Sequence, residues 1–557
     1  MRVTLLCLTL VTGIAAIVLA LLMPSHLRAT DPFVITKLGR EGKSLVQLAA
    51  ETAPINPAVA KVLLASAESM NLGGTDVVIE ELRAAARERG RARTILEELE
   101  AKESGRIQVS ETTILTALRE APNRERLLAS LQSGEAKQVL RNRNLTNLTL
   151  FASVKSAAGL PLDVAILTTA FLLEQRALPP SLALHDQVLR QAAQPDYALE
   201  ELYLSMFALA KRFSSEQLIA LMANVPDVNA MHILTRYIQE HASTAPLVFS
   251  AVFATKNGGA VAAYLDKYPK TAEQDLSFAF GAGIGGLNRV LEDQRPVYRC
   301  SVYDSVAGSS IFGGMLGPFV SLSAGAPTVA ILLKIGLLAL GGFLIATSTK
   351  FRRPNPEEKD YVFYPKYSLI RRGAFAALFV TLALILGEPY LAQGEQKTPP
   401  VRWSSPLLGA ANAASQTAIS TAQKITPMLD PHTILAIVTF LVLQAVIYAV
   451  CLAKIAEIRK QPVSSSTKLK LLDNEDNLFD GGLYAGLFGT AGSLILLTLG
   501  AIKPSLVSAY SSTLFGILFV ALLKIGHVRP LKRRLLLEGA AEPEPTTTTA
   551  PVRNPFA

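Results

Sequence analysis

Two ionisable side chains lie inside long apolar runs of the sequence. Lys334 falls about two turns into the run 328–347, and Glu388 falls about one turn from the end of the run 374–392. A charge within a lipid-exposed segment is costly and usually faces protein, water or a partner. If the two runs are neighbouring antiparallel spans, both side chains sit at similar depth near the outer side. They then form a structural ion pair or extend to the interface, or else they belong to a proton or ion path.

Small residues recur at helical spacing in and beside the last two apolar runs, 483–502 and 506–523, which are separated only by Lys503-Pro504-Ser505. Each run has about 20 residues, the length that a helix needs to cross a hydrocarbon core. Small side chains on one face let helix backbones approach closely, and such contacts drive helix association in lipid. The residues that we expect to pack in this way are Gly482, Gly486, Gly489, Ser493, Ser508, Ser512 and Gly516. Their partners are helices of the same chain or of sister copies.

Two short motifs stand out in these runs. The first is Gly486-Leu487-Phe488-Gly489-Thr490-Ala491-Gly492, and the second is Ser511-Ser512-Thr513-Leu514-Phe515-Gly516. The first resembles the G-L-L-G-T-V-x-G signature of the MotA/TolQ/ExbB proton-channel subunits, and the second is similar to the T-x-x-G element in the next helix of that family. A basic segment, 529–534, follows, as it often does there. The resemblance covers about residues 433–538.

The resemblance implies a role for two threonines. Thr490 and Thr513 would line a pore formed by several copies of the subunit, around a partner helix that carries an aspartate. Their hydroxyls would bond water or the partner carboxyl without titrating themselves. A threonine in a membrane helix also bonds the carbonyl one turn earlier, which is a purely structural role. Because 483–523 contains no carboxylate, a proton path there needs one from another chain, or Glu388.

Composition favours an integral membrane protein with a substantial soluble part. Of the 557 residues, 50% are hydrophobic and only 18% are charged. The net charge of +9 comes largely from basic residues beside apolar runs, so it indicates orientation in a bilayer rather than nucleic-acid binding. The three cysteines form no disulfide framework, and the six histidines show no metal-ligand spacing. Hydrolase and nucleotide-binding motifs are missing from the sequence, so we expect neither an enzyme nor a cofactor or metal.

The apolar runs predict six membrane spans and their orientation. Basic residues cluster in 350–372, 454–470 and 524–534, which places both termini in the cytoplasm. The expected organisation is an uncleaved signal anchor (1–24), an outer helical domain (30–300), an interfacial or re-entrant segment (308–326), a helical pair (327–392), an outer linker (393–431), a three-helix region (432–537) and a disordered tail (538–557). If 311–324 crosses the membrane, the helical domain is cytoplasmic instead.

The region 30–300 is predicted to be all helical. Apolar residues recur at intervals of three and four in short segments, and turn residues such as Pro179-Pro180 separate them. Alternation of the strand type is nearly absent. This pattern indicates an α-solenoid or an irregular helical domain. The fold class expected is therefore all-α, a multi-pass membrane protein with a large extracytoplasmic solenoid-like domain.

Two functions follow from these features. In the first, the chain is a MotA/TolQ/ExbB-like subunit of a bacterial inner membrane. It would form a homo-oligomer in the lipid with a single-span partner that bears an intramembrane aspartate, and it would couple ion flow to work in the cell envelope. In the second, the chain is a membrane-anchored scaffold or receptor whose outer helical domain binds proteins. A transporter is a third alternative, although repeated broken helices are absent from the sequence.

Overall fold

The computed structural model describes residues 2–88, 94–107, 112–194, 196–300, 303–304, 310–348, 369, 372–374, 376–377, 380, 431–498 and 506–541. Over these residues the regular structure is helical, apart from an isolated β-bridge between Thr30 and Val297. The predicted all-α class is confirmed. The described residues fall into two compact units. We call those from 28 to 325 the helical unit, and those up to 27 and from 326 onward the apolar unit.

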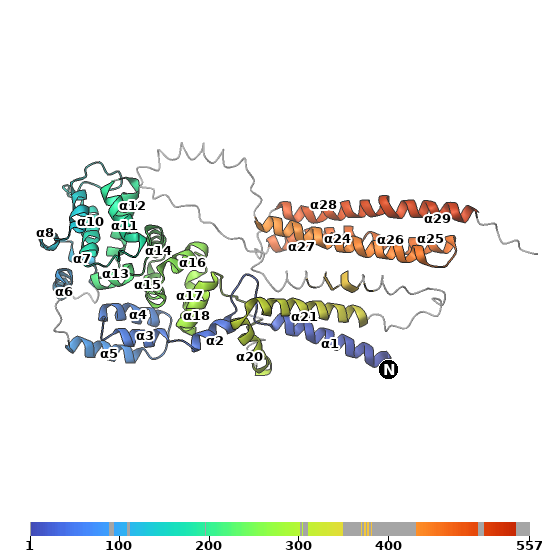
Figure 1. The fold of residues 1–557 in the computed structure, drawn as a ribbon, viewed down its shortest axis with the longest axis horizontal. Coiled ribbons are helices and arrows are strands. Elements are labelled where there is room, and N and C mark those ends of the chain that lie inside the picture. The colour runs from blue at the N-terminus through green and yellow to red at the C-terminus, as the bar shows by residue number, and fades with distance from the viewer. Residues whose placement is uncertain are drawn as a thin grey trace, which may run out of the picture. The chain divides into compact units, whose positions relative to one another are not determined.

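The helical unit consists of short helices joined by tight turns (Figure 1). Its elements are α2 (Pro32–Arg40), α3 (Leu45–Thr52), α4 (Pro57–Ser69), α5 (Thr75–Glu88), α6 (Ile95–Ile107), α7 (Ile114–Ala117), α8 (Ala121–Ser130), α9 (Gly134–Leu140), η1 (Arg141–Asn144), α10 (Leu160–Glu174), α11 (Ala183–Ala193), α12 (Tyr197–Ala210), α13 (Ser215–Met222), α14 (Val228–Glu240), η2 (Ala242–Thr244), α15 (Ala245–Thr255), α16 (Gly258–Lys267), α17 (Ala272–Ala282), α18 (Ile284–Asp293) and α20 (Ser310–Gly325).

Capping residues explain where many of these helices begin. The Asn56 side chain accepts a hydrogen bond from Val59 N, and Pro57 occupies the first helical position, where a missing N–H costs nothing. Ser44 and Gln47 form a reciprocal capping box at the start of α3. Gly283 joins α17 to α18 at φ +126°, and a Cβ there would collide with the carbonyl of Gly39. Only glycine suits that turn.

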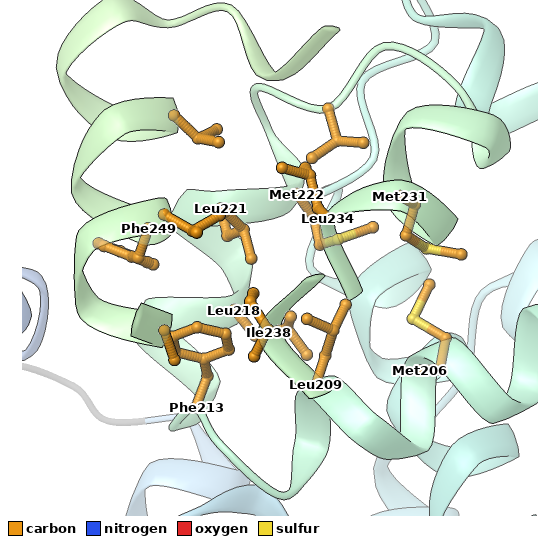
Figure 2. Close-up of a cluster of buried hydrophobic side chains, with 14 of the residues drawn as sticks. Met206, Leu209, Phe213, Leu218, Leu221, Met222, Met231, Leu234, Ile238 and Phe249 are labelled. Carbon is orange, nitrogen blue, oxygen red and sulfur yellow. The ribbon is translucent and has the colours of Figure 1, made fainter. Parts of the chain in front are cut away.

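One hydrophobic core runs through the helical unit. Successive helices pack on one another, with α12 against α10 and α14, and α15 against α16. Figure 2 shows part of this core, where side chains from α12 to α15 converge. The labelled residues are Met206, Leu209, Phe213, Leu218, Leu221, Met222, Met231, Leu234, Ile238 and Phe249, all of them buried. Apolar residues spaced by three and four along each helix supply this core.

Buried carboxylates hold the connecting segments onto this core. Glu200 on α12 accepts hydrogen bonds from Thr149 N (3.0 Å) and Leu150 N (2.7 Å), which fixes the long connection before α10. Asp163 pairs with Arg143 (2.7 Å) and Arg124 (2.9 Å). Because a buried charge is tolerated only when it is paired or hydrogen-bonded, these contacts fix the loops firmly.

The first and last parts of the helical unit are fastened together. Thr30 N donates to Pro296 O (2.8 Å), and Tyr298 N donates to Thr30 O (2.9 Å). The Tyr303 hydroxyl donates to Asp31 Oδ2 (2.7 Å), and Asp31 also caps α2. The chain therefore enters and leaves this unit at neighbouring points.

The apolar unit contains a helical pair and a separate bundle (Figure 1). Its elements are α1 (Arg2–Leu22), α21 (Pro327–Ser348), α24 (Pro431–Lys460), α25 (Ser465–Asn474), α26 (Asp476–Phe479), α27 (Gly481–Thr498), α28 (Leu506–Leu523), the π-helical turn η6 (Lys524–Val528) and α29 (Arg529–Ala541). Three stretches in the described chain have the length and hydropathy of a membrane span, namely Pro327–Ser348, Phe440–Lys460 and Tyr510–Ala540. Nearly all of the predicted span 374–392, the linker 393–431 and the tail beyond 541 lie outside the described residues.

Helices α1 and α21 are antiparallel and pack through glycines. A Cβ on Gly13 would lie 3.2 Å from Gly341 O, and a Cβ on Gly341 would lie 2.9 Å from Gly13 O. This glycine pair was not predicted from the sequence. Close backbone approach of this kind is the usual basis of helix association in lipid.

In the bundle, α24 packs against α27 and α28. The ends of α24 and α28 pack with α25, α26, η6 and α29 around a second, small core. Its buried members are Cys451, Ile455, Ile458, Leu472, Phe479, Leu523, Val528, Leu531 and Leu535.

Candidate functional site

The site is built where α27 and α28 cross. The two helices are antiparallel, because Gly482 lies beside Gly516 and Val520 while Gly489 lies beside Ser512. A Cβ on Gly486 would lie 2.8 Å from Ser512 O, so only glycine permits this approach without a shift of backbone. The small residues predicted to pack between helices therefore meet within one chain. Of the seven, Ser493 and Ser508 lie on α27 and α28, but their side chains are outside the described part of the structure.

Three hydroxyls converge on one backbone carbonyl at this crossing. Ser512 Oγ and Thr490 Oγ1 each lie 3.1 Å from Gly486 O, and the Thr490 and Thr513 Oγ1 atoms are 2.5 Å apart. A hydroxyl has one proton to donate but accepts with two lone pairs. One threonine therefore donates to the other, which donates to Gly486 O, 3.1 Å from Thr490 Oγ1 and 3.4 Å from Thr513 Oγ1. Thr490 and Thr513 thus join two helices, although both side chains are only half-buried.

A buried amide on α24 makes a further polar contact with α27. Gln444 is 1% exposed, and its Nε2 donates to Gly482 O (2.9 Å). A Cβ on Gly516 would lie 3.4 Å from the same Nε2, so the amide occupies space that glycine leaves open. We refer to Gln444, Thr490, Ser512, Thr513 and the Gly486 carbonyl as the polar seam. Gln444 was not predicted from the sequence, although it is the single amide in the apolar run 434–452.

An ion-pair cluster at the end of the bundle next to α26 was also not predicted from the sequence. Lys524 Nζ lies 2.8 Å from Asp480 and 3.5 Å from Asp476. Nearby, the Tyr448 hydroxyl and His527 Nε2 are 3.0 Å apart. Asp480 comes immediately before α27, so the Lys524 pair fastens the start of α27 to the end of α28. The signals in the sequence were the acidic segment 473–480 before the first apolar run, 483–502, and the lysine that follows the second run, 506–523.

Lys334 is buried beside the end of α1. Its Nζ donates to Ser25 O (2.7 Å), just beyond the end of α1, and the side chain is 4% exposed. A cation beside the last carbonyls of a helix interacts favourably with the helix dipole. The proposed partner, Glu388, lies outside the described residues. The structure thus gives Lys334 a packing role between α1 and α21.

The polar seam offers hydrogen bonds but no acid or base. Its members are hydroxyls, an amide and a carbonyl, none of which titrates near neutral pH. Within the described residues, no group of His, Cys, Asp or Glu side chains could hold a metal ion. The seam can therefore accept hydrogen bonds from water or from a donor on another chain, but it cannot exchange protons by itself.

Comparison of the chain with protein-family models, with curated proteins and with solved structures finds no match.

Proposed function

We propose that this chain is a multi-pass membrane subunit of an ion-driven assembly, similar to the MotA/TolQ/ExbB proton-channel subunits. The observation that carries the proposal is the Thr490–Thr513 hydroxyl pair at a glycine-packed crossing of two apolar helices. Both threonines belong to the motifs that resemble that family. Their side chains are half-buried, so both threonines are partly accessible to water or to a partner helix.

The arrangement of the first helices supports a multi-pass topology. In the sequence the helical unit lies between α1 and α21, which pack antiparallel. Because Thr30 bonds to residues 296–298, that unit forms an insertion with adjacent ends. A domain with adjacent ends can be inserted in the turn between two antiparallel membrane helices. With the basic clusters on the cytoplasmic side, the helical unit would be extracytoplasmic, and its successive helix packing fits a solenoid-like domain.

Ion coupling requires a carboxylate that the polar seam lacks. The closest acidic side chain along α27 is Asp480, and it already pairs with Lys524. We therefore assign the titrating group to a single-span partner with an intramembrane aspartate, and Glu388 of this chain is the alternative. Several copies of this chain would surround that helix, with Thr490 and Thr513 toward it.

Substitution of both threonines by valine tests the proposal. Valine has nearly the shape of threonine but no hydroxyl, so T490V/T513V should still assemble at the wild-type mass. It should lose proton flux when the chain and its partner are reconstituted together. The control is Ala491→Ser, which adds a hydroxyl at an exposed position beside the seam and should leave the flux unchanged. Wild-type flux in T490V/T513V would refute the proposal.

A membrane-anchored scaffold is the second candidate, and one observation favours it. The seam hydroxyls donate within the chain, to Gly486 O and to each other, so they already serve helix packing. The helical unit would then bind proteins, and the apolar unit would serve as its anchor. T490V/T513V would be functional in that case, whereas removal of residues 30–300 would abolish partner capture.

A further inference from the structure

A basic and apolar stripe runs along the exposed side of η6 and α29. Ile525, Arg529, Arg533 and Leu537 recur at every fourth residue and share one helix face. Ile525 is 63% exposed and Leu537 is 65% exposed, and both arginines are exposed as well. Together with Pro530, Arg534 and Glu538, these residues line a shallow groove of about 640 Å³.

The π turn sets which side chains face outward. Pro530 has no N–H to donate to the carbonyl four residues earlier, that of Gly526, and its ring crowds that carbonyl. The helix widens over Lys524–Val528, so the buried positions pass from Leu523 to Val528 with a gap of five before Leu531 and Leu535 continue them. The buried side therefore stays continuous, and Arg529 and Arg533 remain on the opposite, exposed side.

The other basic residues here have acidic partners. Lys524 pairs with Asp480, Lys532 pairs with Asp473 (2.6 Å), and Arg534 pairs with Glu538 (2.8 Å). For Arg529 and Arg533 no ion pair is found within the described residues. These two exposed arginines are thus available to a ligand, and a planar guanidinium suits phosphate oxygens well.

The position of the arginines along the helix favours phospholipid headgroups as the source of a phosphate ligand. Arg529 is six residues beyond Leu523, or roughly 9 Å along the axis, and the headgroup region is about 5–7 Å thick per leaflet. Helical side chains lean toward the N-terminus, which on α29 is the side of the apolar span. Arg533 is ten residues beyond Leu523, or roughly 15 Å, so its guanidinium reaches back to the outer edge of the headgroups, whereas that of Arg529 lies among them and Ile525 lies next to the acyl chains.

We propose that Ile525, Arg529 and Arg533 form a binding site for the headgroup of an anionic phospholipid. The inference rests on the proposed membrane insertion of α28 and not on ion coupling. A second copy is a poorer occupant, because a symmetric contact through this stripe would place arginines against arginines. Leu537 lies about 21 Å beyond Leu523, outside the headgroup region, and takes no part in the site.

Native mass spectrometry of the full chain, released from nanodiscs with equal phosphatidylglycerol and phosphatidylcholine, tests the site. Wild-type protein should retain the anionic lipid preferentially, and R529Q/R533Q should reduce that preference by roughly fivefold per arginine. The matched control is R459Q/K460Q, which removes the same charge from the exposed end of α24 and should keep the preference.

Three results would overturn the inference. They are equal retention of both lipids by the wild type, an equal loss in the two double variants, and a change of oligomeric mass in R529Q/R533Q, which would indicate a second copy on the stripe. Carbonate extraction of the same membranes separates this failure from failure of the proposed function. A chain released by carbonate refutes membrane insertion, whereas an inserted chain without lipid preference refutes the lipid site alone.

Discussion

Packing of α6 against α13 should be less stable at high pH, and Glu100→Gln should remove this pH dependence. The Glu100 side chain is 8% exposed, and its oxygens lie 2.8 Å from Ser215 N and 2.9 Å from Ser215 Oγ, at the start of α13. Burial raises the pKa of this carboxyl to about 8, and the neighbouring Glu97 and Glu216 add to the rise, while the Ser215 hydrogen bonds oppose it. Glu100 also lines a cavity of about 210 Å³ with Lys61 and Arg212.

The sign and size of the effect follow from proton linkage. The pKa in the docked state, about 8, exceeds the ordinary value of 4.5, so the docked state keeps a proton that the opened state releases. The stabilisation is complete below pH 4.5 and is lost as the pH rises to 8. Each pH unit inside that window costs up to about 1.4 kcal/mol, so the change from pH 5.5 to 7.5 is about 2–3 kcal/mol.

Hydrogen exchange of the α6 amides at the two pH values, corrected for intrinsic rates, measures this change. In the wild type the protection of 95–107 should fall by roughly 30- to 100-fold on going to pH 7.5. The substituted amide in E100Q stays neutral, accepts from Ser215 N and donates to Ser215 Oγ, so the protection of this variant should not vary with pH. Glu98→Gln, at an exposed ion pair with Arg126, should retain the wild-type slope. An identical slope in wild type and E100Q would refute the reasoning.

Three further substitutions test the packing contacts. Gly486→Ala forces a Cβ to within 2.8 Å of a backbone oxygen and should lower the unfolding free energy of the bundle by about 1–3 kcal/mol in a denaturant titration, whereas Gly481→Ala, with open space around it, should not. Lys334→Met leaves the carbonyl beyond α1 without this donor and should cost about 1–3 kcal/mol, seen as faster proteolysis between α1 and α2. Tyr303→Phe removes the hydroxyl that donates to the Asp31 carboxylate and should likewise expose the start of the helical unit to protease, with the core helices still protected.

Helices could be predicted from the sequence because their signals are local. Apolar spacing and capping residues specify a helix within one or two turns, so the all-α class followed directly. Helix packing through the glycines and serines of 482–516 could also be predicted, since small residues at helical spacing are typical of packed membrane helices. The helix that each of these faces contacts could not be predicted. Gly486 meets Ser512 within one chain, and only the three-dimensional arrangement distinguishes this from contact with a sister copy.

Partners of polar residues were harder to predict, because they depend on contacts between distant segments. The sequence suggested Glu388 as a partner of Lys334 from depth alone, and Glu388 lies outside the described residues, whereas the hydrogen bond to the Ser25 carbonyl joins residues 309 positions apart. Gln444 was overlooked because one amide barely alters the hydropathy of an apolar run. Its importance comes from Gly482 and Gly516, which leave room for it.

Water access at the polar seam tests the proposed function most directly. Cysteine replaces Thr490, Thr513 or Phe488 in a chain whose natural cysteines at 7, 300 and 451 are alanine. Intact membranes are then treated with a small water-soluble thiol reagent. We expect T490C and T513C to react at least tenfold faster than F488C, although Phe488 is 79% exposed and the threonines are half-buried. Reaction of F488C alone, or of none of the three until detergent is added, would contradict a water-filled path beside the seam.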